Sequence, residues 1–78
     1  MSKLRIEQGE GLVRAFNEQW PEGTPVTLIN DDGNPEQTST RSKAWCLGHG
    51  EPVVSVVGRT GGYLLSRVIP HRVISDHV

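Results

Sequence analysis

The sequence predicts a mainly β domain of the α+β class, in which an N-terminal helix precedes a small five-stranded barrel. Two observations predict this order. Apolar residues recur at helical spacing near the N-terminus, over residues 8–20. From residue 24 to residue 78, short runs rich in β-branched residues alternate with glycine- and proline-rich turns. At 78 residues, the chain is expected to form a single domain, residues 1–78.

The helix is expected because four apolar residues share one helical face: Leu12, Val13, Phe16 and Trp20. We expect this face to lie on a sheet. Gly9 and Gly11 weaken the helix, since glycine in a helix interior costs on the order of 1 kcal/mol against alanine. Pro21 predicts the end of the helix, because the residue before a proline is disfavoured in helical conformation.

The first half of the β part is expected to contain a strand, a turn and an edge strand. In the run EGTPVTLIN, Val26 and Leu28 share one face of a strand, and Thr27 and Ile29 share the other. DDGNP is rich in turn-forming residues. The polar, threonine-rich run EQTSTR predicts an exposed or edge strand returning from that turn. The next run, SKAWCLGHGEP, is ambiguous between a short strand and a connection.

The C-terminal half carries the strongest strand pattern. The run VVSVVG is dense in β-branched residues, and YLLSRVI is its expected partner strand. Between them, RTGG predicts a hairpin turn in which Gly61 and Gly62 are free to take positive φ. A turn and a short last strand around Val73 and Ile74 are expected to end the chain. This closing order is typical of SH3-like barrels, whose closure removes exposed sheet edges.

The composition of the chain limits its expected binding partners and cellular compartment. With 8 basic and 9 acidic residues, the net charge is −1, whereas nucleic-acid binding normally shows as a basic excess. The single cysteine excludes an internal disulfide and favours a reducing compartment. No apolar run approaches the roughly 20 residues that a membrane span needs. We therefore expect a cytoplasmic protein that does not bind a membrane.

Metal binding and catalysis have little support. Cys46 and His49 stand in a C-x-x-H spacing, but zinc sites want about four ligands, usually in paired short spacings. Cys46, His49 and an acid, Asp31 or Asp32, could form a nucleophilic set, and this small-enzyme reading is the least favoured class. Such a set needs a cleft that a small barrel seldom offers. We expect no cofactor, no metal and no catalytic residue.

Binding of a macromolecule is the favoured class of function. Residues 37–78 carry a local charge of +3, and small barrels can bind nucleic acid by combining basic and aromatic side chains. Tryptophan, tyrosine and arginine are also enriched at protein interfaces. The candidate residues for either partner are Arg41, Lys43, Trp45, His49, Arg59, Tyr63 and Arg67. A homodimer is a further candidate, because the core of so short a chain is thin.

One pattern resembles a group of small uncharacterised proteins encoded in tailed bacteriophages and prophages. The pattern is GTPV, then TRSxAWxLG, then PVVxVxGxxGGYxLxxV, and it lies within residues 23–68. The resemblance implies a phage origin and an SH3-like fold, and it implies no activity. We therefore expect a non-enzymatic phage accessory protein that contacts a host or phage protein in the host cytoplasm. Modulation of host defence or host metabolism by direct protein contact would fit this expectation. A nucleic-acid-binding module is the alternative.

Overall fold

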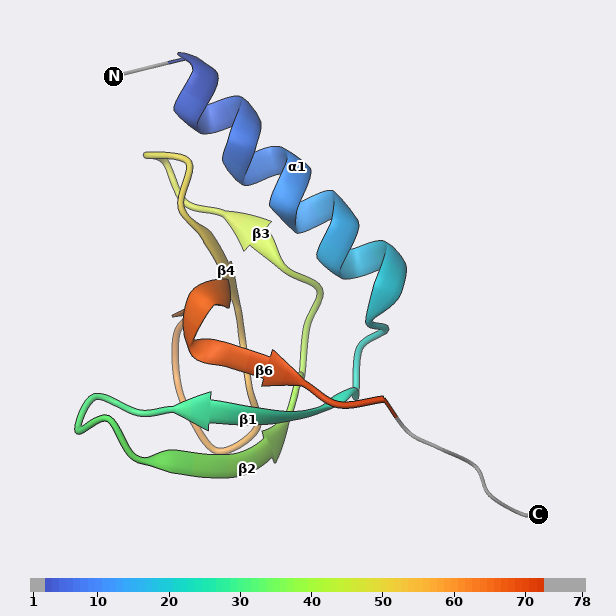
Figure 1. Cartoon of the computed structure of the whole chain (residues 1–78), viewed down its shortest axis with the longest axis vertical. Coiled ribbons are helices and arrows are strands. Elements are labelled where there is room, and N and C mark those ends of the chain that lie inside the picture. Colours follow the sequence, from blue (N-terminus) through green and yellow to red (C-terminus); the bar gives the residue numbers. More distant parts are fainter. Residues whose placement is uncertain (1–2, 73–78) are drawn as a thin grey trace.

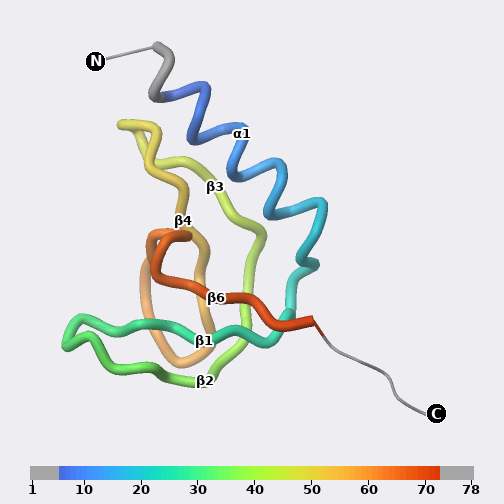
Figure 2. Tube along the Cα trace, in the orientation of Figure 1, coloured from blue at the N-terminus to red at the C-terminus, as the bar shows by residue number. Residues whose placement is uncertain are grey.

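One helix and two small antiparallel sheets make up the computed structural model, which describes residues 3–72 (Figures 1 and 2). The protein is therefore of the α+β class, as predicted. Helix α1 (Lys3–Gln19) runs along one side of the molecule, and the strands lie beside it. Within residues 3–72, the strand ladders form two separate sheets and no closed barrel is found. The five-stranded SH3-like barrel therefore stays a prediction.

Helix α1 begins at Lys3 rather than at residue 8, and it ends just before the predicted stop at Pro21. The amide of Trp20 closes the last turn by donating to the carbonyl of Phe16 at 2.7 Å. Phe16 is buried, and Val13 and Trp20 pack against the core, as expected for a helix on a sheet. Leu12 departs from the prediction: it is 56% exposed, because it lies at the edge of the apolar face.

The first sheet has the order β2-β1-β6 and contains β1 (Pro25–Ile29), β2 (Pro35–Ser39) and β6 (Val68–Pro70). Val26 and Leu28 of β1 are fully buried, which confirms the predicted inward face. Strand β2 lies at the edge of the sheet, as its polar sequence predicts. The turn between β1 and β2 is closed by Asn30, whose side chain accepts hydrogen bonds from the amides of Asp32 and Asn34.

The second sheet has the order β3-β4-β5 and contains β3 (Trp45–Cys46), β4 (Pro52–Val54) and β5 (Tyr63–Leu64). Strand β4 is shorter than the predicted run VVSVVG, because Val56 leaves this sheet and forms a bridge with Thr40. That bridge joins the chain after β2 to the chain after β4. It is the direct backbone link between the strand segments of the two sheets in the described residues.

The run YLLSRVI does not form one strand, contrary to the prediction. It divides at the 3-10 helix η1 (Leu65–Arg67), which turns the chain from β5 in one sheet to β6 in the other. Strand β6 pairs antiparallel with β1, so the first and the last described strands are neighbours. The turn expected to begin at Pro70 is not found there, because Pro70 belongs to β6 and the amide of His71 continues the pairing by donating to the carbonyl of Pro25 at 2.9 Å. The last strand predicted around Val73 and Ile74 falls outside the described residues.

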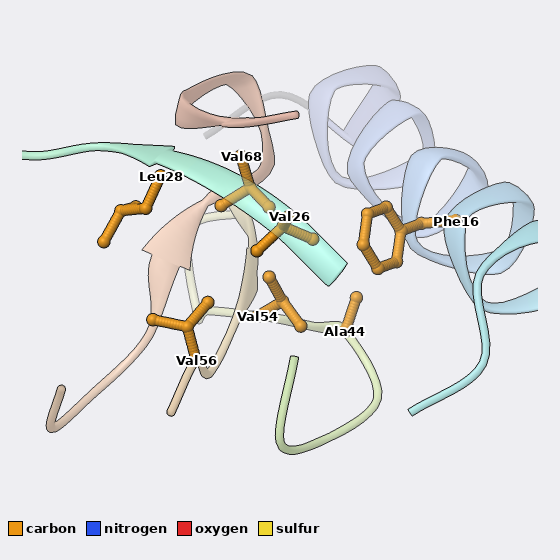
Figure 3. Packing of buried hydrophobic residues seen from close by; sticks show 7 residues of the cluster. All are labelled: Phe16, Val26, Leu28, Ala44, Val54, Val56 and Val68. Carbon is orange, nitrogen blue, oxygen red and sulfur yellow. The ribbon is translucent and has the colours of Figure 1, made fainter. Parts of the chain in front are cut away.

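The core lies between the two sheets and is capped at one end by α1 (Figure 3). In Figure 3, Phe16 points from the helix toward Val26 and Ala44. The buried cluster contains Phe16, Val26, Leu28, Ala44, Val54, Val56 and Val68. Burying an aliphatic or aromatic side chain of this size contributes about 1.5–3 kcal/mol. So small a cluster makes the polar links between α1 and the sheets important for stability.

Two links hold α1 against the second sheet. Asn17 donates through Nδ2 to the carbonyl of Ala44 at 3.1 Å and accepts from the amide of Ala44 at 2.8 Å. This side chain therefore pairs with the backbone as a neighbouring strand would. About two helical turns toward the N-terminus, Gly9 packs directly on Gly50, in the turn between β3 and β4. Neither contact is local, so neither is visible in the sequence.

Candidate functional site

The structure separates the seven predicted site residues into three groups. Arg41, Lys43 and His49 are exposed in the segments that flank β3. Trp45 lies within β3 and is 38% exposed. The other three are half-buried and lie after β4: Arg59, Tyr63 and Arg67. The predicted residues therefore do not converge on one site.

Arg59 is held by an acidic side chain of the first sheet. Its guanidinium forms two hydrogen bonds with the carboxylate of Glu36, one of them from Nε to Oε1 at 3.2 Å. The hydrogen bonds from Arg59 and from Asn30 lower the pKa of Glu36 below its usual range. The same carboxylate raises the pKa of Arg59. Arg59 thus links the β4–β5 connection to β2. Because its guanidinium is already bonded to Glu36, little of it is available to a binding partner.

Arg67 is also paired. Its Nη1 lies 3.1 Å from Oδ1 of Asp31, in the turn between β1 and β2, and its guanidinium carbon lies 5.9 Å from the centre of the Tyr63 ring. Such exposed pairs contribute only about 0–1 kcal/mol each. Their relevance here is to charge, because Asp31 and Glu36 neutralise two of the four cations proposed for nucleic acid. The basic surface of the β half is weaker than the sequence suggests.

Trp45 contributes to an apolar face on the outside of the second sheet. Trp45 pairs with Val53, and Val53 pairs with Leu64, so these three side chains lie in one row across β3, β4 and β5. Val53 is 1% exposed but lies outside the main core cluster, because it is covered on this outer face. Trp45, Leu47 and Leu64 remain 38%, 43% and 37% exposed. We call this surface, formed by Trp45, Leu47, Val53 and Leu64, the Trp45 face.

A second apolar feature lies between α1 and η1, and it shares Leu64 with the Trp45 face. It is a cavity of about 420 Å³, lined by Leu12, Pro52, Leu64, Leu65 and Ser66. A smaller cavity of about 170 Å³ shares Leu12 and Pro52 with it and extends along α1 to Gln8, Gly50 and Glu51. We call the two together the helix groove. The larger cavity is lined by apolar residues apart from Ser66, the smaller one also by Gln8 and Glu51, and Leu12, which lines both, is 56% exposed.

A third cavity, of about 290 Å³, lies where α1 leads into β1. Trp20 lines it, with the guanidinium carbon of Arg72 5.5 Å from the centre of the indole. His71 borders the same cavity, and its Nε2 lies 2.6 Å from Oγ1 of Thr27. His71 and Arg72 therefore already have partners within the protein.

The catalytic and metal hypotheses gain no geometric support. Cys46 is half-buried beneath α1, with its Sγ 3.4 Å from the position that a Cβ on Gly9 would occupy. His49 is exposed in the turn that follows. Within residues 3–72, no three histidine, cysteine, aspartate or glutamate side chains gather in a way that could hold a metal ion.

In the described residues, no helix is long and apolar enough to cross a membrane. Comparison with known proteins finds no match to this chain among family models, curated proteins or solved structures.

The helix groove was not predicted from the sequence. Leu12 was expected to lie on the sheet, and Leu65 and Ser66 were expected within a continuous strand. The structure instead places Leu65 and Ser66 in η1, where they line the groove together with Leu12 of α1. A serine and arginine within YLLSRVI, an otherwise apolar run, were the available signal that the strand would break there.

Proposed function

We propose that this protein binds another protein through the helix groove. The single observation that carries the proposal is an aliphatic groove of about 420 Å³ whose rim residue, Leu12, is 56% exposed. Contiguous exposed apolar surface on a small protein marks interaction sites, whereas single exposed apolar residues do not. Leu12 does not stand alone, since it borders Pro52, Leu64 and Leu65.

The groove suits a partner segment that presents aliphatic side chains. A helix laid beside α1 would place apolar residues three and four apart into such a groove. The groove continues past Gly50 to Glu51, an acidic residue at its end. A basic residue on the partner, next to its aliphatic anchors, would complement that carboxylate.

Two predicted residues support the wall of the groove rather than contact the partner. Tyr63 packs on the core from β5, and Arg67 joins the end of η1 to Asp31. Together they fix the segment that supplies Leu64, Leu65 and Ser66. We therefore expect substitutions of Tyr63 or Arg67 to weaken binding through the position of this wall.

The finer fold assignment belongs to the same proposal: the two sheets are the halves of one SH3-like barrel. The antiparallel pairing of β1 with β6 and the bridge between Thr40 and Val56 support it, because both connect segments that a closed barrel must join. A one-turn η1 before the last strand also fits the closing order expected from the sequence.

The biological setting that we propose follows the sequence resemblance. The protein would be a non-enzymatic accessory protein of a tailed bacteriophage, acting in the cytoplasm of the host on a host or phage protein. Its mechanism would be occlusion, in which a rigid surface covers part of the partner. Nucleic-acid binding through Arg41, Lys43, Arg59 and Arg67 is the alternative, and the pairing of Arg59 and Arg67 with carboxylates counts against it.

The test is affinity capture from a lysate of a host bacterium with the wild-type chain and two variants. Leu12→Lys places a charge on the rim of the groove at an exposed helical site, so the fold should be retained. Val57→Lys is the matched control, because Val57 is 53% exposed and lies beside β2, where its amide bonds to Ser39. We expect the Leu12 variant to lose the captured protein and the Val57 variant to keep it.

Nuclease and salt separate the two classes of partner. A protein captured equally with and without nuclease, and lost with Leu12→Lys, would support the proposal. Capture that disappears with nuclease and falls steeply with salt would favour the nucleic-acid alternative instead. Equal capture by the Leu12 variant and the wild type would show that the helix groove is not the binding site.

A further inference from the structure

We propose that the cavity at the end of α1 binds a small zwitterion of the α-amino acid type that carries an apolar side chain. We call this cavity of about 290 Å³, where α1 leads into β1, the Trp20 cavity. Among the described residues, it shares none of its lining with the helix groove. Binding there would therefore be independent of the proposed function.

The apolar part of the Trp20 cavity comes from an indole and two prolines. Trp20 is half-buried and packs on the core, and Pro21 and Pro25 line the cavity beside it. Ligand cavities are usually lined by apolar and aromatic side chains, with a few polar groups that set the orientation of the ligand. A volume of about 290 Å³ lies close to the lower limit for such cavities, which is about 300 Å³. The ligand should therefore be small and partly apolar.

The walls of the Trp20 cavity are held in place by hydrogen bonds. In one wall, the amides of Gly23 and Thr24 donate to Oγ1 of Thr40, at 3.0 and 3.1 Å, and Thr40 is buried. In the other wall, the amide of His71 donates to the carbonyl of Pro25 at 2.9 Å. The cavity is thus formed before a ligand binds, which lowers the entropic cost of binding.

Two opposite charges line the Trp20 cavity without pairing with each other: the carboxylate of Glu22 and the guanidinium of Arg72. Within residues 3–72 the structure has two ion pairs, and neither Glu22 nor Arg72 takes part in them. A ligand with only a negative charge would be repelled by Glu22, and a ligand with only a positive charge would be repelled by Arg72. A ligand with one charge of each sign suits both residues.

Arg72 keeps its hydrogen-bond donors although it already contacts Trp20. Its guanidinium carbon lies 5.5 Å from the centre of the indole, so the ring covers a face of the guanidinium. The N–H groups lie in the guanidinium plane, in a fork that matches the two oxygens of a carboxylate. Contact with the indole also restrains this long side chain, so less conformational freedom is lost on binding. We therefore assign the carboxylate of the ligand to Arg72.

The ammonium group of the ligand is assigned to Glu22. Glu22 lies three residues after Gln19, where α1 ends. The last carbonyls of a helix carry a partial negative charge, which favours a cation at this end of the cavity. The side chain of the ligand would then lie against the indole of Trp20. A carboxylate, an ammonium group and an apolar side chain on one small molecule describe an apolar α-amino acid.

Isothermal titration calorimetry of the full chain with L-leucine and with L-phenylalanine tests the proposal. We expect saturable binding of at least one of the two. Blocked forms of that amino acid then test each charge, because the N-acetyl form lacks the ammonium group and the amide form lacks the carboxylate. We expect each blocked form to bind at least about tenfold more weakly, since each leaves one charged side chain of the cavity without its partner.

Two variants assign the charges to their residues. Arg72→Gln should bind the free amino acid about tenfold more weakly and no longer distinguish it from the amide form by more than about threefold. Glu22→Gln should lose the distinction from the N-acetyl form in the same way. Arg41→Gln removes an exposed cation outside the cavity, so this control should bind as the wild type does. Circular dichroism verifies that each variant is folded.

Tryptophan emission locates the binding site independently of the charge variants. Trp45→Phe leaves Trp20 as the only tryptophan of the chain, and its emission should change with the dissociation constant that calorimetry gives for the wild type. Absence of saturable binding with both amino acids would overturn the proposal. Equally tight binding of the N-acetyl form would overturn it as well, because the cavity would then take a simple anion. Wild-type affinity in both charge variants would show that the ligand binds elsewhere.

Discussion

The indole of Trp45 lies against the backbone of Gly62. A Cβ placed on Gly62 would come within 3.0 Å of Cζ2 and Cη2 of Trp45 and within 2.8 Å of Cγ2 of Val53. Real Cβ atoms do not approach carbon so closely, so any side chain at this position must displace the indole or the valine. Gly62 thus sets the position of the largest side chain on the Trp45 face.

Replacing Gly62 by alanine should destabilise the protein and move Trp45. Overpacking of this kind costs about 1–3 kcal/mol, and we expect a loss in that range in urea unfolding. The displaced indole should also change the tryptophan emission of the folded state. Gly48→Ala is the matched control, since nothing lies within 4 Å of its added methyl and its φ is not positive. Equal stability of the two variants would show that Trp45 adapts without cost.

The role of Gly62 could not be predicted from the sequence. Gly61 and Gly62 were both expected to take positive φ in a tight turn. Gly61 does, with φ of 77°. Gly62 does not, and its lack of a side chain is required by Trp45, which is 17 positions away in the chain. A glycine needed for a turn can be recognised locally, whereas a glycine needed for a distant ring requires the fold.

Gly9 and Gly11 are predicted to respond in opposite directions to the same substitution. A Cβ on Gly9 would lie 1.8 Å from the carbonyl oxygen of Gly50, a backbone atom that cannot rotate away. Nothing lies within 4 Å of a Cβ on Gly11. Alanine at Gly11 should stabilise the protein by about 0.5–1 kcal/mol, the usual gain in a helix interior. Alanine at Gly9 should destabilise it by about 1–3 kcal/mol, since α1 must move off the β3–β4 turn.

Thermal or urea unfolding of the two variants measures this contrast, and each serves as the control for the other. Stabilisation by both alanines would mean that α1 does not pack closely on Gly50. The sequence predicted the same cost for both glycines, because helix propensity carries no information about neighbours in space.

The parts of the fold that follow from local pattern were predicted, and the parts set by distant contacts were not. Val26 and Leu28 alternate with polar neighbours, so their burial was visible in the sequence. The pairing of Arg59 and Arg67 with carboxylates was not visible, because their partners lie 23 and 36 positions away. The sequence therefore overestimated the free positive charge of the β half.

We predict that the stability of the protein depends on the amide group of Asn17. Its side chain both donates to and accepts from the backbone of Ala44. Asn17→Ala removes both bonds and should cost about 1–3 kcal/mol, since the backbone groups of a buried residue lose their partner. Asn17→Asp keeps the acceptor but sets a carboxylate against the carbonyl of Ala44. We expect this variant to be destabilised at neutral pH and to recover in part below about pH 4, where a protonated carboxyl can donate.

Unfolding of both variants at two pH values tests this idea. The alanine variant has no group that titrates at this position, so it is the control for the pH effect. If the aspartate variant does not gain on the alanine variant at low pH, the bond from Asn17 to the Ala44 carbonyl contributes little.

Glu36 should make stability depend on pH in the acid range. Hydrogen bonds from Arg59, and then from Asn30, lower its pKa in the folded protein. A carboxyl with a lowered folded pKa contributes stability that is fully present above its unfolded pKa, for which the ordinary value is 4.5. That contribution is lost as the pH falls through the lower, folded value. The wild type should therefore lose stability relative to Glu36→Gln as the pH decreases below about 4.5.

Thermal midpoints of both proteins, measured from about pH 7 to about pH 2, give the comparison. The wild type should be the more stable protein at neutral pH, and the difference should shrink through the acid range because protonated Glu36 no longer attracts the guanidinium. Glu22→Gln removes an exposed carboxylate outside this network and should leave the shape of the pH profile unchanged. A difference between wild type and Glu36→Gln that stays constant from neutral to acid pH would contradict the ion pair between Glu36 and Arg59. The charge of Arg59 would then be unpaired, and this result would favour the alternative hypothesis that the protein binds nucleic acid.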